Sequence, residues 1–170
     1  MAQAAATRFD SPWGSFQLQR YPSRRQDPLR AWCAADQLLL DACRHEGLGG
    51  KQVGVANDDH GALTLPLQPA WCWTDSALSR YAIEANLRRN GLPAVPIAWS
   101  TQCPGTVVDA VVLRIPKQIP YLEYQLALLA GWLPAGTLLL AGGMDKHLSP
   151  HTAALIERSF GPTTRHRGPR

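Results

Sequence analysis

The chain has 170 residues, of which 45% are hydrophobic and 18% are charged. This length suits one ordinary domain, and the apolar share is too high for a disordered chain. No apolar run approaches the ~20 residues that a membrane-spanning helix requires. The N-terminus has neither the charged start nor the long apolar stretch of a secretory signal. We therefore expect a globular, cytoplasmic domain without a membrane partner.

The formal net charge of +4 is concentrated at the two ends of the chain. Residues 1–30 hold five Arg and two Asp, and three further arginines (Arg165, Arg167 and Arg170) lie in the last six residues. Such basic ends suit nonspecific phosphate contact, although arginines also simply keep a solvated tail soluble. Four cysteines, Cys33, Cys43, Cys72 and Cys103, show no zinc-site spacing and are expected to be reduced and mostly buried.

The first 30 residues are punctuated by proline and glycine, and we expect them to be irregular apart from one edge strand within 15–19. Pro28 is expected to open a helix, because apolar residues recur at three- and four-residue spacing from Leu29 to Ala42. The glycines of residues 47–50 then end it.

From residue 51 onwards, strands and helices alternate. The expected strands cover residues 52–56, 70–74, 95–99, 107–115 and 137–141. The expected helices cover residues 62–67 (or an apolar turn), 75–90, 121–132 and 151–160. This order predicts an α/β fold with an open, mostly parallel sheet and helices on both faces. We divide the chain into an N-terminal extension of residues 1–50 packed on the sheet, a domain of residues 51–164 and an irregular basic tail of residues 165–170.

A sheet of this kind binds ligands at the carboxyl ends of its strands, where a nucleotide-like cofactor needs a glycine-rich turn after the first strand. A methyltransferase fingerprint would read D-x-G-x-G-x-G there, but this chain has bulky polar residues from Asn57 to His60, and only Gly61 remains. Asp75, after the second strand, stands where an acid would bind ribose. It could equally cap the next helix together with Ser76.

The fourth strand leads into Arg114-Ile115-Pro116-Lys117. Amino-group methyltransferases carry N-P-P-[FYW] or D-P-P-[FYW] at this place, and only Pro116 is retained. A cation cannot accept hydrogen bonds from an amine, so we expect no catalytic residue here. Arg114 and Lys117 could instead contact RNA phosphate, or they could be exposed charges at the end of a strand.

Other kinds of site find little support in the sequence. Asp58, Asp59 and His60 could bind a metal ion in principle, but the side chains of consecutive residues rarely converge on one ion. No metal is therefore expected. The six tryptophans fall mainly in predicted strands and helices. They are expected in the core rather than in a base-stacking platform.

Five segments together resemble the N-terminal domain of the bacterial large-subunit ribosomal RNA guanine-N2 methyltransferases of type G, which are related to the small-subunit type C enzymes. The segments are Pro28-Leu29-Arg30-Ala31-Trp32-Cys33-Ala34-Ala35-Asp36, Ala56-Asn57-Asp58-Asp59-His60-Gly61-Ala62-Leu63, Asn86-Leu87-Arg88-Arg89-Asn90-Gly91, Arg114-Ile115-Pro116-Lys117 and Gly161-Pro162-Thr163-Thr164. The resemblance runs from about Phe16 to Thr164.

The resemblance implies two tandem Rossmann-like class I methyltransferase domains in one polypeptide. The second binds S-adenosylmethionine and carries N-P-P-F, whereas the first has lost the cofactor fingerprint and helps to position ribosomal RNA. It implies a vestigial cofactor site at Asn57, Gly61 and Asp75. The candidate RNA contacts are the helix cations Arg88 and Arg89, which are expected to face water, and the strand-end cations Arg114 and Lys117. In the family the sheet continues beyond Thr164, so we expect a truncated or frameshifted product that lacks the last strands.

Three hypotheses follow for the function. In the first, the chain is the non-catalytic, RNA-positioning half of such an enzyme and does not bind the cofactor by itself. In the second, it is a compact methyltransferase with Asp75 on the ribose and Asn57 near the methionine end. In the third, it is an interaction module that docks on a separate methyltransferase domain through its open sheet edge.

Overall fold

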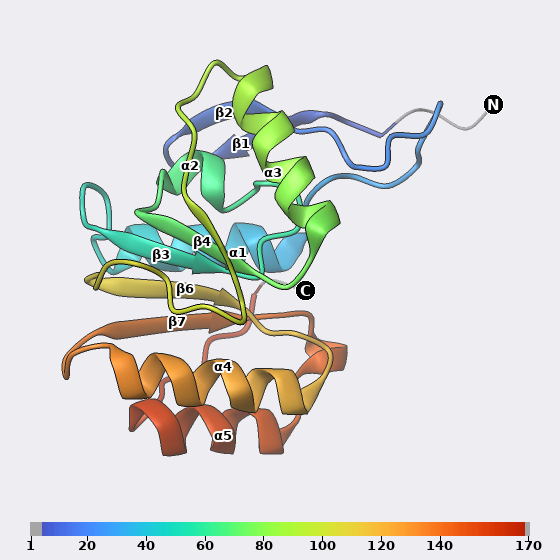
Figure 1. Ribbon diagram of the computed structural model, residues 1–170. Coiled ribbons are helices and arrows are strands. Elements are labelled where there is room, and N and C mark those ends of the chain that lie inside the picture. Colours follow the sequence, from blue (N-terminus) through green and yellow to red (C-terminus); the bar gives the residue numbers. More distant parts are fainter. Residues whose placement is uncertain (1–4, 169–170) are drawn as a thin grey trace.

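The computed structural model describes residues 5–168, and its centre is a five-stranded sheet in which every pair of neighbours is parallel (Figure 1). The strand order is β5-β4-β3-β6-β7. The strands are β3 (Val53–Ala56), β4 (Trp71–Thr74), β5 (Ile97–Trp99), β6 (Ala110–Arg114) and β7 (Leu138–Gly142). All five lie within the predicted strand ranges to within one residue, so the alternating pattern located them correctly.

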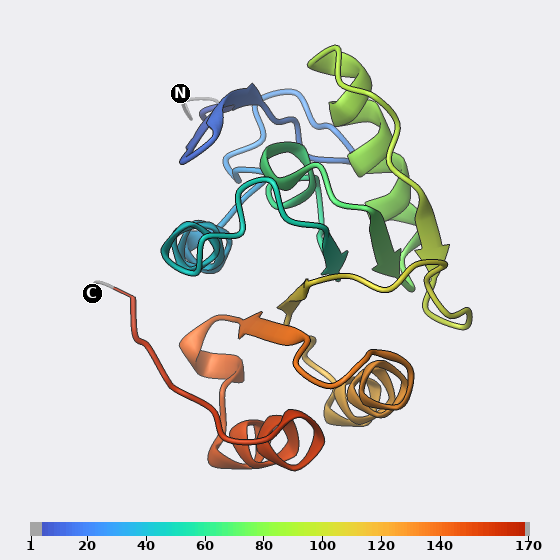
Figure 2. The ribbon, with the colours of Figure 1, turned by 90° about the vertical axis from the view of Figure 1, so that its left-hand side faces the viewer.

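Helices cover both faces of the sheet, which confirms the predicted layers (Figure 2). One face carries α1 (Ala34–His45), α2 (Thr64–Leu67) and α3 (Ala77–Arg89). The other face carries α4 (Ile119–Trp132) and α5 (Pro150–Phe160), and the short 3₁₀ helix η1 (Asp145–His147) follows β7. Within residues 5–168, no helix is long and apolar enough to cross a membrane.

The two faces of the sheet bury alternate residues of each strand, as a strand period of two requires. Val55 of β3 and Val112 of β6 pack towards α1, α2 and α3. Trp71 belongs to the other core, which α4 and α5 cover. Gly54 of β3 lies directly beneath the Trp71 ring, because a Cβ at residue 54 would stand 2.2 Å from ring atoms of Trp71. The absent side chain of Gly54 therefore makes the space that the indole fills.

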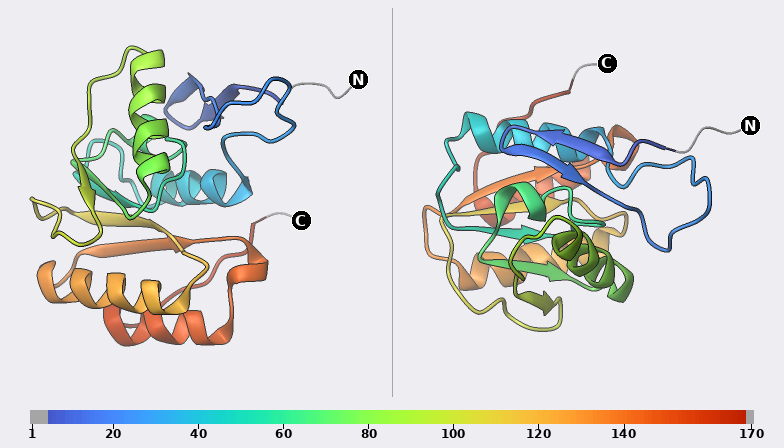
Figure 3. Two further views of the ribbon diagram at one scale, coloured as in Figure 1. Left: turned by 45° about the vertical axis from the view of Figure 1, so that its right-hand side comes forward. Right: turned by 90° about the horizontal axis from the view of Figure 1, so that it is seen from above.

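The N-terminal segment forms a hairpin of its own from β1 (Arg8–Ser11) and β2 (Gly14–Gln17). The strand expected within residues 15–19 therefore pairs with β1, which the sequence did not predict, and not with the edge of the main sheet. The hairpin lies over the helical layer of α1, α2 and α3 (Figure 3). Phe9 and Leu18 share a buried core with Val55, so the hairpin completes this layer of the domain. The division at residue 50 stays a prediction.

The predicted start of α1 at Pro28 is wrong. The helix begins at Ala34, where the backbone N–H of Cys33 donates to the Asp36 carboxylate at 2.8 Å. The apolar spacing misled because Leu29 is 57% exposed, outside the helix. At the other end, residues 161–168 form neither helix nor strand, and Gly168 lies against Leu38 of α1. The last two residues of the predicted basic tail lie outside the described residues.

Candidate functional site

The candidate site lies at the switch point of the sheet. From β3 the chain proceeds to β4 and β5 on one side, whereas β6 and β7 lie on the other. Ligands of open parallel sheets bind outside the carboxyl ends of the strands at such a point. Asn57 is the first residue after β3 and has φ 63°, a conformation that asparagine tolerates better than most residues. Its backbone N–H donates to the Trp73 carbonyl at 2.9 Å, which continues the sheet ladder by one step.

The Asn57 side chain spans the switch point itself. Its Nδ2 donates to the backbone carbonyl of Arg114, at the end of β6, at 2.9 Å. The same group donates to Gln125 Oε1 at 2.7 Å, and Gln125 Nε2 donates back to Asn57 Oδ1 at 3.0 Å. Gln125 is fully buried on α4. A paired amide thus ties β3, β6 and α4 together where a ligand would enter.

Tyr121 completes this group of side chains, which we call the switch-point network (Asn57, Tyr121 and Gln125). Its hydroxyl donates to Asn57 Oδ1 at 3.2 Å and accepts from Gln125 Nε2 at 3.1 Å. Burial raises the pKa of Tyr121 to about 12, and the nearby Asp75 carboxylate adds to the shift. The phenol is therefore neutral at physiological pH and can serve both as donor and as acceptor.

Asp58 and Gly61 shape the turn after β3. The buried Asp58 carboxylate accepts from the backbone N–H groups of Gly61, Leu63 and Thr64 and from the Thr64 hydroxyl. Gly61 has φ 104°, and a Cβ there would lie 2.6 Å from Leu65. Both residues therefore hold the entrance to α2, and Gly61 serves close packing within the protein.

Asp75 stands at the carboxyl end of β4, as the sequence predicted, and is exposed. The alternative that Asp75 shares the helix cap is wrong, because the N-cap of α3 is Ser76 alone, whose Oγ accepts from the Ser79 N–H at 3.1 Å. The Asp75 carboxylate thus takes no part in capping α3, and it lies near Tyr121. A ribose-binding role for Asp75 stays a prediction.

Arg114 and Lys117 differ sharply in their surroundings. The Arg114 guanidinium forms an ion pair with Asp36 of α1, and the two side chains are 15% and 4% exposed. Burial opposes the charged guanidinium, but the Asp36 carboxylate, together with Cys33 and Asp59, raises the pKa of Arg114 overall. Arg114 is therefore directed inward, whereas Lys117 is exposed in the loop before α4. An RNA contact by either residue stays a prediction.

Arg88 and Arg89 lie exposed in the last turn of α3. Two asparagines hold the N-terminal segment against this helix: Asn86 within α3 and Asn90, its C-cap residue. Asn90 exchanges two hydrogen bonds with the backbone of Gln17, at 2.8 Å each. Asn86 does the same with the backbone of Gln19, at 3.0 and 2.9 Å, and also donates to the His60 carbonyl at 2.7 Å.

This arrangement, which we call the asparagine clamp (Asn86 and Asn90), gives a structural meaning to the Asn86-Leu87-Arg88-Arg89-Asn90 segment. Residues four apart share one face of a helix, so the two asparagines point at the hairpin together. The two arginines between them are exposed.

Sequence reasoning missed several residues that shape the site. Gln125 was hidden inside an apolar helical stretch, and Asp36 inside an apolar periodicity; a single polar residue on the buried face of a helix was the available signal. Among residues 5–168, no three His, Cys, Asp or Glu side chains gather as a metal site would require. The four cysteines are free, with Cys43 and Cys72 buried, Cys33 half-buried and Cys103 exposed, so the expectation of mostly buried thiols holds for part of the set.

Solved structures with this fold include RNA methyltransferases. The chain superposes on the 16S rRNA N2 G1207 methyltransferase of T. thermophilus, solved with AdoMet and guanosine, with a TM-score of 0.68 and 22% identity over 91% of this chain and 45% of that one. A SAM-dependent methyltransferase from Streptococcus mutans gives a TM-score of 0.64 at 12% identity, over 95% of this chain and 48% of that one. At these identities the likeness shows the fold, which is that of the Rossmann-like methyltransferases.

Sequence relatives are closer. The ribosomal RNA large subunit methyltransferase G of Alcanivorax borkumensis is 39% identical, over 91% of this chain and 43% of that protein. The protein of the same name from Streptomyces griseus is 38% identical, over 92% and 43%. The chain thus spans less than half the length of these relatives. A family model described as the RLMG N-terminal domain matches residues 6–170. The chain therefore belongs to the RLMG N-terminal domain family, as the resemblance of its motifs predicted.

Proposed function

We propose that this chain is the RNA-positioning, non-catalytic N-terminal domain of an S-adenosylmethionine-dependent large-subunit rRNA guanine-N2 methyltransferase. In this proposal the catalytic domain that binds the cofactor lies in the same polypeptide, and the protein works in the cytoplasm where ribosomes are assembled. The observation that carries it is the Asn57 side chain, which bridges β3 and β6 at the place where the cofactor would lie.

The residues at the strand ends do not fit S-adenosylmethionine. A cofactor of this class needs backbone that it can approach closely after the first strand. Asn57 instead puts a side chain there, and its amide is engaged with Gln125 and with the Arg114 carbonyl. Admitting a ligand would break these bonds and leave the Oε1 of the fully buried Gln125 unpaired, at a cost of about 1–3 kcal/mol. Gly61 is the one glycine of the turn, and Leu65 packs against it, so its backbone is not open to a cofactor.

For RNA, the proposal relies on exposed cations. Arg88, Arg89 and Lys117 are exposed and can reach phosphate groups, whereas Arg114 is already neutralised by Asp36. We therefore give Arg114 the structural task of joining β6 to α1. Contacts from arginine and lysine to phosphate supply the affinity of most RNA complexes and make it salt-dependent.

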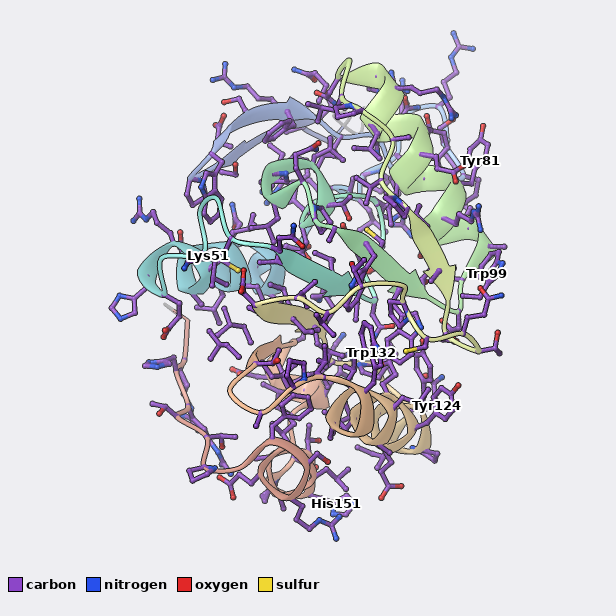
Figure 4. The ribbon with its side chains drawn as sticks, turned by 60° about the vertical axis from the view of Figure 1, so that its left-hand side comes forward. Lys51, Tyr81, Trp99, Tyr124, Trp132 and His151 are labelled. Carbon is purple, nitrogen blue, oxygen red and sulfur yellow. The ribbon has the colours of Figure 1, made fainter. Side chains whose placement is uncertain are left out.

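Two measurements on the 170-residue chain test the proposal. Isothermal titration with S-adenosylmethionine at up to about 1 mM, far above an ordinary cofactor Kd, should give no heat of binding. Binding to a large-subunit rRNA fragment should weaken with salt. The double variant Arg88→Ala/Arg89→Ala should lower the slope of log affinity against log salt by about 2. The single variant Lys51→Ala is the charge control, since Lys51 is exposed and lies far from α3 (Figure 4). Saturable cofactor binding would overturn the non-catalytic assignment.

A second candidate function is a compact methyltransferase that uses this domain alone. What favours it is the exposed Asp75 carboxylate at the end of β4, the place of a ribose-binding acid. If the parent chain binds S-adenosylmethionine and Asp75→Ala does not, this candidate replaces the first.

A further inference from the structure

The helix α3 and the segment 19–27 present arginine and tyrosine side chains side by side. Arg89 Nη2 donates to the Tyr21 hydroxyl at 2.9 Å, and the Tyr21 and Tyr81 rings meet edge to face, with centroids 5.2 Å apart. Tyr81 is 53% exposed. The contact with Tyr21 holds the Tyr81 ring edge to face, and more than half of the Tyr81 surface is open to a ligand.

The series continues along the same side of the molecule. The Arg80 guanidinium lies over the Trp99 ring at 5.1 Å from its centroid, and it also bonds Glu84 at 3.2 Å. Trp99 is half-buried at the edge strand β5. Figure 4 shows Tyr81 and Trp99 on one side of the molecule, with Lys51 on the opposite side.

The charge of these two elements is strongly positive. Segment 19–27 holds three arginines and one acid, Asp27, and α3 holds three arginines and one acid, Glu84. The Asp27 carboxylate accepts from the Leu29 N–H, and Glu84 is paired with Arg80. The excess of guanidinium groups attracts a polyanion, which could be a nucleic acid or an acidic protein surface. The aromatic rings that alternate with these arginines favour a nucleic acid, because its bases stack both on aromatic rings and on guanidinium planes.

We propose that Tyr21, Tyr81, Arg80, Trp99 and Arg89 form a stacking platform for the bases of single-stranded RNA. This inference rests on the proposed function and makes it specific: the domain would hold an unpaired RNA segment rather than a duplex. The bases of a duplex are stacked on one another and cannot lie on a protein ring, whereas those of a single strand can. The expectation that the tryptophans serve the core is then correct for Trp71 and Trp73, which are buried. It is also correct for Trp13, Trp32 and Trp132, which pack against the two cores, so Trp99 is the exception.

The test compares RNA forms and variants by fluorescence anisotropy. The probe is a fluorescein-labelled single strand of about 12 nucleotides, used alone or annealed to its complement. The single strand should bind more tightly than the duplex. Tyr81→Ala should raise the Kd for the single strand about five-fold or more and leave the duplex almost unchanged. Tyr81→Phe keeps the ring and should bind like the parent. Lys51→Ala, on the opposite side, should preserve the preference for the single strand.

The outcomes separate the two proposals. Because Tyr81 is more than half exposed, its variants should fold, and matching urea unfolding curves will verify this. If the parent binds RNA but Tyr81→Ala binds the single strand equally well, the platform is overturned while RNA positioning stands, and the ring is left for contact with a protein. Equal affinity for single strand and duplex has the same meaning. A parent that binds neither form overturns both proposals.

Discussion

The asparagine clamp should contribute most of its stability through Asn86. Asn86→Ala leaves three backbone groups without their partner: the N–H of Gln19, the carbonyl of Gln19 and the carbonyl of His60. Asn86 is fully buried. Each polar group left without a partner in such a place costs about 1–3 kcal/mol. Because Gln19 and His60 are half-buried and water can reach part of them, we take the lower end and expect a loss of about 3 kcal/mol.

Asn90→Ala is the matched control. Asn90 also makes three hydrogen bonds, two with the Gln17 backbone and one with the Asn86 carbonyl. Gln17 is exposed, however, so water replaces the lost partner and the expected cost is about 1 kcal/mol or less. The same chemistry four residues apart thus tests burial alone.

Urea unfolding followed by circular dichroism gives the free energy of each variant. A loss of about 3 kcal/mol should also lower the melting temperature by about 6–12 °C in a domain of this size. Trypsin should cut at Arg20, Arg24 or Arg25 faster in Asn86→Ala than in Asn90→Ala, because the clamp holds the segment that contains these sites. If Asn86→Ala costs no more than Asn90→Ala, buried hydrogen bonding is not what holds the hairpin in place.

Three further predictions concern buried polar groups. Thiol labelling should modify the exposed Cys103 quickly and the buried Cys43 only on unfolding, because burial raises the pKa of Cys43 to about 12; quick labelling of Cys43 would contradict the packing of α1. Burial lowers the pKa of His60, so the neutral form favours the fold above the unfolded pKa of about 6.5, and stability should fall as pH drops below it. The pH dependence should be shallower in His60→Gln. Asp36→Ala leaves the Arg114 guanidinium buried without its partner and should cost about 3–5 kcal/mol, measured by urea unfolding; a loss below 1 kcal/mol would refute this.

The sequence was informative about the sheet because strand and helix periods alternate clearly after residue 50. It failed at the N-terminus, where tertiary contacts decide the structure. The true start of α1 depends on the Asp36 carboxylate bonding Cys33, while Leu29, which fits the apolar spacing, stays outside the helix. The hairpin strand β1 is four residues long and buries only Phe9. That burial comes from packing on distant elements rather than from any local pattern.

The candidate site was predictable in place but not in detail. Sequence order located Asn57 and Asp75 at strand ends, as parallel topology requires. The partner of Asn57 lies 68 residues away, on the buried face of α4, and no local spacing relates the two. Arg114 illustrates the same limit, since the direction of a guanidinium at a strand end depends on whether an acid from another helix is within reach.

The pairing of Gly54 with Trp71 links two positions that are distant in the chain but adjacent across β3 and β4. Trp71 is almost completely buried and its indole N–H donates to the Thr106 carbonyl at 2.9 Å, so the ring has one place to lie. A methyl group at residue 54 would clash with the Trp71 ring and displace it. The side chains at positions 54 and 71 therefore compete for the same space. A larger residue at position 54 is tolerated only if the residue at position 71 becomes smaller. Any relative with a side chain at position 54 should carry a smaller residue at position 71.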